Sequence, residues 1–125
     1  GVSSRSYKLK VAYIYNFTKY VTWPESVFTS EKSPFVIGIL GHDPFGTTID
    51  ALTKKSVNKH PIAIKRFKTV NEISQCHILF VSGFEVDAQH LEALKAMDGK
   101  STLIAGEASG FAQSGATVSF FDDAD

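Results

Sequence analysis

Two continuous apolar runs constrain the fold of this chain more than any other feature of its sequence. The runs read FVIGILG over residues 35–41 and HILFVS over residues 77–82, and each has the length of a strand rather than of a helix. A strand with one face in water alternates apolar and polar residues, whereas a strand covered on both faces does not. Both runs therefore predict buried strands of a parallel sheet.

The segments around these runs alternate between strand and helix patterns. Further strands are predicted over residues 61–67, 101–107 and 116–121, and the clearest amphipathic helix over residues 86–97. Strands that alternate with helices form right-handed βαβ units. We therefore expect a single α/β domain over residues 1–125. It should have three layers, with a mainly parallel five-stranded sheet, helices on both faces and a flavodoxin-like or Rossmann-like topology.

Two additions complete the predicted fold. Asp43 stands where it would cap a helix directly after the first strand, with Pro44 at the first helical position. A helix over residues 6–21 precedes the first strand and is apolar or aromatic on nearly every side, whereas a surface helix has one apolar stripe about 100° wide. We therefore expect this first helix to serve both the core and a partner.

The two faces of the first helix are assigned from its side chains. We expect the face that closes the core to carry Leu9, Tyr13, Phe17 and Tyr20. Aromatic residues favour interface hot spots. The expected contact with a partner or a second copy therefore comprises Val11, Tyr15, Tyr20 near the helix end and Trp23 beyond it.

Charge and cysteine content argue against several classes of function. Thirteen Lys and Arg balance 13 Asp and Glu, so no excess of positive charge favours nucleic acid as a partner. The single cysteine, Cys76, excludes an intramolecular disulfide and a multi-cysteine zinc site. The four histidines lack metal-ligand spacing such as HExxH. No apolar run reaches the ~20 residues of a membrane-spanning helix. We therefore expect no metal, no cofactor and no membrane insertion.

The carboxyl ends of the predicted strands are where ligands of open α/β sheets bind. We expect a ligand crevice there, formed by Gly41, His42, Asp43, Gly106, Glu107 and Ser109. The alternative for Glu107 is a structural carboxylate that accepts backbone amides of the following turn. A hydrolase using His42, Asp43 and Glu107 is the enzymatic alternative, but no spacing in the sequence sets these residues as a catalytic group. We therefore expect no enzymatic activity.

Four segments occur in the order and at the approximate spacing of a known family, and they span nearly the whole chain. They read KVAYIYNFTKYVTWP, FVIGILGHDPFG, CHILFVS and GEASGFAQSGATVSFF. Together they resemble the YfiR family of bacterial periplasmic proteins. The resemblance implies a periplasmic α/β domain, often dimeric and without enzymatic activity, whose signal peptide has been removed.

The resemblance also implies regulation by protein–protein contact. The best-known member of the family represses a membrane-bound diguanylate cyclase by binding the periplasmic sensor region of that enzyme. An outer-membrane OmpA-like lipoprotein sequesters the repressor. For this chain we expect the same repression, which controls cyclic-di-GMP signalling and biofilm formation, together with a homodimer. The alternative is a small-molecule-sensing domain of a larger signalling protein such as a histidine kinase.

Family members commonly continue past the last strand seen here with a further strand and a C-terminal helix. This chain ends at FFDDAD, so we expect the domain to lack those two elements. One edge of the sheet would then be left unpaired, which favours association with another chain.

Overall fold

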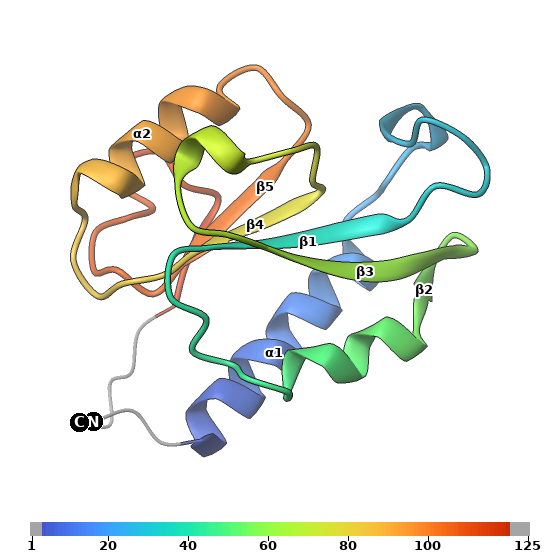
Figure 1. The fold of residues 1–125 in the computed structure, drawn as a ribbon, viewed down its shortest axis with the longest axis horizontal. Coiled ribbons are helices and arrows are strands. Elements are labelled where there is room, and N and C mark those ends of the chain that lie inside the picture. Colours follow the sequence, from blue (N-terminus) through green and yellow to red (C-terminus); the bar gives the residue numbers. More distant parts are fainter. Residues whose placement is uncertain (1–3, 121–125) are drawn as a thin grey trace.

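The computed structural model describes residues 4–120, which form an α/β domain built on a six-stranded sheet (Figure 1). In sheet order the strands are β2 (Ser56–Val57), β3 (His60–Phe67), β1 (Phe35–Leu40), β4 (Ile78–Val81), β5 (Leu103–Gly106) and β6 (Val118–Ser119). The α-helices are α1 (Ser4–Tyr20) and α2 (Ala88–Met97). Short 3₁₀ segments are η1 (Glu25–Val27), η2 (Ile49–Lys54) and η3 (Val70–Glu72).

Five of the strands run parallel, and their order in the sheet is second, first, third, fourth and fifth along the chain. This is the flavodoxin-like order, which confirms the predicted fold class. The sequence does not predict β2, a two-residue strand that pairs antiparallel with β3. In the turn between them Asn58 and Lys59 both have positive φ, of 49° and 72°. Asn-Gly marks such a turn more clearly than Asn-Lys does.

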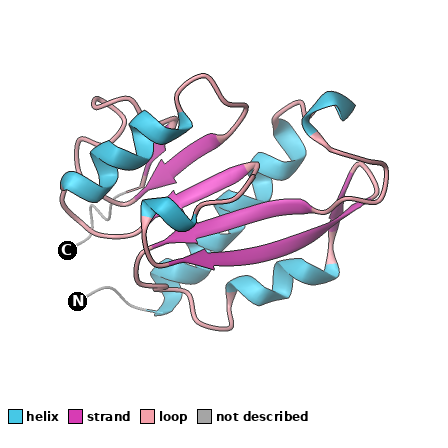
Figure 2. Ribbon diagram, turned by 45° about the horizontal axis from the view of Figure 1, so that its top comes forward, coloured by secondary structure: helices cyan, strands magenta, loops and turns pink. Residues whose placement is uncertain are grey.

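Helical segments cover both faces of the sheet, as the two apolar runs predict (Figure 2). On one face, α1 and η2 share a core cluster with Ile37, Ile39 and Phe80. On the other face, α2 and η3 pack with Leu40 and Leu79. Every residue of β1 and β4 is buried. Continuous apolarity in these strands therefore reflects two separate cores, one on each face.

The helix predicted directly after β1 is wrong in its start and in its type. Asp43 Oδ1 accepts a hydrogen bond from the Phe45 amide at 2.7 Å, which closes an Asx turn instead of capping a helix. Its Oδ2 lies 2.7 Å from Arg66 Nε. Gly46 has φ +57°, which a right-handed helix does not allow. The helical segment therefore begins only at Ile49 and is a 3₁₀ helix.

α1 turns a different face to the sheet from the one that its aromatic residues predict. Val11 and Ile14 are buried, and with Thr18 they form a stripe at the i, i+3, i+7 spacing of one helix face. All three side chains are β-branched and compact. Trp23 is also buried, and its Nε1 donates to the Phe17 carbonyl at 3.2 Å. The prediction that Val11 and Trp23 face outward is therefore wrong.

The opposite side of α1 is exposed and aromatic. Leu9, Tyr13 and Tyr20 are 56%, 46% and 79% exposed, and Val21, directly after the helix, is 36% exposed. The prediction that Leu9, Tyr13 and Tyr20 close the core is therefore wrong, whereas Phe17 does pack against the core. We call Leu9, Tyr13, Tyr20 and Val21 the α1 outer face.

Candidate functional site

The residues of the predicted crevice lie at the carboxyl edge of the sheet, but they are engaged by different partners. Gly41, with φ +94°, directly follows β1, and His42 is exposed. Asp43 pairs with Arg66 of β3, while Glu107 pairs with α1. Within residues 4–120, no hydrogen bond joins His42 or Asp43 to Glu107. The three candidate hydrolase residues are therefore not linked as a catalytic group in this structure.

Glu107 is buried and forms an ion pair with Lys10 of α1. Glu107 Oε2 lies 3.1 Å from Lys10 Nζ, and the two side chains are 2% and 5% exposed respectively. The Lys10 ammonium also lies 4.9 Å from the centroid of the Tyr7 ring. The pair joins α1 to the carboxyl end of β5. Sequence reasoning missed Lys10. This lysine precedes Val11 of the buried stripe and is itself buried, and a buried ammonium requires a charged partner.

Gly106 and Ser109 take different positions in the segment that follows β5. Gly106 is buried against Phe111, and a Cβ placed on Gly106 would lie 2.7 Å from Phe111 Cδ2 and 2.9 Å from the Val81 carbonyl oxygen. Ser109 is exposed, and its amide donates to the Phe84 carbonyl at 3.4 Å. Gly106 therefore permits close packing of an aromatic ring, and a ligand would not reach it without moving that ring.

Replacing Gly106 tests this packing. We expect Gly106→Ala to lower the free energy of unfolding by about 2 kcal/mol, because the added methyl group overpacks the contact with Phe111. Gly110→Ala is the control. Gly110 has φ +83° and no atom near its would-be Cβ, so only backbone strain of about 1 kcal/mol is expected. Urea unfolding of both variants measures the difference, and equal losses would contradict the packing role of Gly106.

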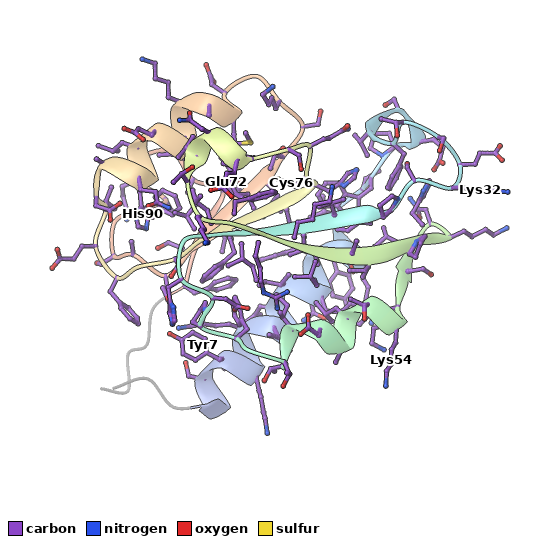
Figure 3. All side chains as sticks on the ribbon, in the orientation of Figure 1. Tyr7, Lys32, Lys54, Glu72, Cys76 and His90 are labelled. Atoms are coloured by element: carbon purple, nitrogen blue, oxygen red, sulfur yellow. The ribbon has the colours of Figure 1, made fainter. Side chains whose placement is uncertain are left out.

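Asp87 is the N-cap of α2, and His90, labelled in Figure 3, lies in the first turn of that helix. Asp87 Oδ1 lies 2.6 Å from His90 Nδ1 and accepts the His90 amide at 3.0 Å. His90 Nε2 is buried without a hydrogen-bond partner. The ring lies edge-on to Phe111, with centroids 4.8 Å apart, and its Cε1 would be 3.2 Å from a Cβ at Gly83. This histidine is therefore a capping residue enclosed by packed neighbours.

His60 is a buried histidine that sequence reasoning did not single out. It is 1% exposed at the start of β3, and its ring stacks on Phe28 with centroids 3.5 Å apart and planes 3° apart. Nδ1 lies 2.7 Å from the Ser33 carbonyl oxygen, and Nε2 lies 2.7 Å from Glu25 Oε1. Both oxygens are acceptors. Only the imidazolium form donates to both at once, so this geometry favours a charged His60.

Electrostatics around His60 agree with the geometry. Burial lowers the pKa of His60, but the hydrogen bonds to Glu25 and Ser33 and the charges of Glu25 and Glu31 outweigh it, so the pKa is raised above 6.5. The pKa of nearby His77 is lowered, mainly by burial and also by the His60 charge. His77 therefore remains neutral, and its two ring nitrogens bond to backbone atoms of strand β1 and segment η1.

Two adjoining cavities of about 510 and 210 Å³ lie at the amino edge of the sheet, opposite the predicted crevice. The larger is lined by Ser26, Val27 and Met97 and by residues 73–77 and 99–102. The smaller shares four of these residues and extends to Lys65. We call the two together the amino-edge groove. A volume of this size is in the range of small-molecule sites.

Cys76, which is labelled in Figure 3, lines the larger cavity. Its thiol is buried and free, and burial raises its pKa to about 11, although the charge of Lys65 opposes the shift. The protonated thiol is a weak nucleophile. Cys76 therefore acts here as a small buried apolar residue.

Tyr15, a predicted contact residue, is half-buried and covered in part by its own chain. The ammonium groups of Lys19 and Lys55 lie 5.1 and 5.0 Å from the centroid of its ring. The ring also packs against the core cluster that contains Val11. Among the predicted contact residues, Tyr20 is thus the most accessible.

The described residues contain no group of three or more His, Cys, Asp or Glu side chains that could hold a metal ion. Among residues 4–120, no helix combines the length and the apolarity needed to cross a membrane.

Comparisons with known proteins gave one match. A family model described as YfiR/HmsC-like matches residues 7–125 of the 125-residue chain. No curated protein and no solved structure matches the chain.

Proposed function

The chain belongs to the YfiR/HmsC-like family, and we propose that it represses a membrane-bound diguanylate cyclase by binding the periplasmic sensor region of that enzyme. Family membership supports the general role, a periplasmic and non-catalytic regulator of diguanylate cyclase signalling. Repression through this contact would lower cyclic-di-GMP and so limit biofilm formation.

The observation that carries the proposal is the α1 outer face. Tyr13, Tyr20 and Leu9 expose large apolar side chains along one side of a single helix. Within residues 4–120 the Tyr13 ring stacks on Phe120, with centroids 5.9 Å apart, and still remains 46% exposed. Contiguous exposed apolar patches mark interaction sites, and tyrosines are enriched among interface hot spots. The proposed contact therefore keeps Tyr20 from the sequence-based prediction and replaces Val11 and Trp23 with residues of the outer face.

Charge specifies the kind of partner. The described part of α1 contains no acidic residue and carries Lys8, Lys10 and Lys19. Lys10 is buried with Glu107, which leaves Lys8 and Lys19 as exposed cations beside the outer face. A partner helix with an apolar stripe and flanking carboxylates complements this surface. A second copy of α1 would bring like charges together, so a homodimer is proposed to use another surface.

We propose two further partners, an OmpA-like lipoprotein and a second copy of this chain. An OmpA-like lipoprotein that competes for the outer face would release the cyclase, because the two partners could not bind there together. Sedimentation velocity with and without the sensor region measures whether a homodimer persists in the complex.

Substitution of the outer face tests the proposal directly. We expect Tyr13→Asp/Tyr20→Asp to weaken binding to the purified sensor region by about 100-fold. Each substitution removes an aromatic contact and places a negative charge opposite the apolar stripe and the carboxylates of the partner. Leu91→Asp is the matched control, since Leu91 is 52% exposed on α2, on the opposite face of the sheet. Isothermal titration calorimetry measures both affinities. Equal affinities of the two variants would contradict the proposed surface.

A further inference from the structure

The amino-edge groove has a charge pattern that the proposed function does not use. Lys100 lines the larger cavity and Lys65 lines the smaller one, and neither lining contains an aspartate or a glutamate. The charge of Lys65 acts on the thiol of Cys76. The two linings together therefore carry two positively charged side chains and no carboxylate.

The groove also offers unused hydrogen-bond donors. Ser26, Ser74 and Ser101 line the larger cavity, and within the described residues their hydroxyl groups make no hydrogen bond to the protein. In contrast, Thr102 donates to the Cys76 carbonyl at 2.8 Å. The three serines come from three separate segments, so their hydroxyl groups are available to a ligand that lies between them.

The remaining walls are apolar or neutral. Val27, Ile73 and Met97 line the larger cavity together with the protonated thiol of Cys76. Both ring nitrogens of His77 are occupied by the backbone, so His77 adds no charge to the groove. A ligand of this site must therefore combine a charged group with an apolar body.

We propose that the amino-edge groove binds a small organic anion, with a carboxylate between the lysines and the serine hydroxyl groups and an apolar or aromatic body against Val27 and Met97. This site lies at the edge of the sheet opposite the carboxyl ends of the strands, where ligands of open α/β sheets usually bind. The site does not involve the α1 outer face, because α1 packs on the other side of the sheet.

The position of the groove gives such a ligand a structural consequence. Ser26 and Val27 belong to η1, whereas residues 99–102 connect α2 to β5. A ligand in the groove therefore bridges the two segments that flank it. His60 contacts Glu25 of η1 and the Ser33 carbonyl in the loop that follows η1, so ligand and histidine would hold the same part of the chain.

Three isosteric probes of different charge test this proposal: benzoate, benzamide and benzamidine. In amide-resolved NMR titrations, we expect benzoate to shift the signals of residues 73–77 and 99–102 saturably, with a Kd of about 1 mM for a ligand of this size. Neutral benzamide should bind more weakly, and cationic benzamidine should give no saturable shift up to about 20 mM.

Charge variants provide the second part of the test. Lys65→Gln/Lys100→Gln should weaken benzoate binding by about fivefold, as expected for two partly exposed ion pairs. Lys54→Gln is the control, because Lys54 lies on η2 on the opposite face (Figure 3) and lines neither cavity. Benzoate binding that maps elsewhere, that benzamidine matches, or that the double variant leaves unchanged would overturn the proposal, as would no shift at all.

Discussion

Glu107→Gln should lower the free energy of unfolding by about 3 kcal/mol, because the variant leaves the ammonium of Lys10 buried without its counter-charge. Such a loss is a large fraction of the 5–15 kcal/mol that stabilises a typical domain. The effect should also reach α1, since the pair joins this helix to the end of β5. Urea unfolding followed by circular dichroism measures the loss.

Two controls separate the buried pair from general effects of charge. Lys10→Met/Glu107→Leu removes both charges, and its stability should return to within about 1 kcal/mol of the wild-type value. Asp50→Asn removes an exposed ion-pair partner of Arg66; the Asp50 side chain is 45% exposed and that of Arg66 is 42% exposed. This variant should lower the free energy of unfolding by no more than about 0.5 kcal/mol. A Glu107→Gln variant as stable as Asp50→Asn would contradict a stabilising role for the buried pair.

The second large effect is a pH dependence that originates at His60. The pKa of His60 in the folded chain lies above its ordinary value of 6.5, so folding favours the protonated form. Its contribution to stability is therefore fully present below pH 6.5 and is lost as pH rises through the raised pKa. We expect the stability difference between the wild-type chain and His60→Gln to shrink as pH is raised above 6.5.

The other titrating groups near His60 allow its contribution to be isolated. The pKa of His77 is lowered, so its contribution is present above pH 6.5 and is lost only as pH falls below that value. Glu25→Gln removes the carboxylate that faces His60 Nε2 and should flatten the profile above pH 6.5. His42→Gln, at an exposed position, should leave it unchanged. A His60→Gln difference that stays constant across this range would contradict a charged His60 in the folded chain.

The sheet was predictable from the sequence because burial on both faces leaves a direct record in the composition of a strand. Phe35 to Leu40 and Ile78 to Val81 are apolar at every position or carry glycine, and every one of them is buried. β2 could not be predicted in this way, because it spans only two residues and its turn uses Asn58 and Lys59 rather than a glycine. Local contacts of Asp43 also overrode the capping signal after β1.

The sequence did not predict the orientation of α1, the ion pair of Lys10 with Glu107 or the amino-edge groove. The compact residues Val11, Ile14 and Thr18 face the sheet, and a prediction based on side-chain size selects the opposite side. Glu107 finds its partner 97 residues away in the chain. The amino-edge groove is assembled from several separate segments, each of which is an ordinary loop or helix end. Only the tertiary structure brings such residues together.

The cellular level of cyclic-di-GMP gives the most direct test of the proposed repression through the α1 outer face. The measurement uses bacteria that contain the cognate membrane cyclase and lack their own copy of this protein. Periplasmic expression of the wild-type chain should lower cyclic-di-GMP, and Leu91→Asp should lower it equally. Tyr13→Asp/Tyr20→Asp, present at the same level and folded, should leave cyclic-di-GMP high. Full repression by that double variant would contradict the account.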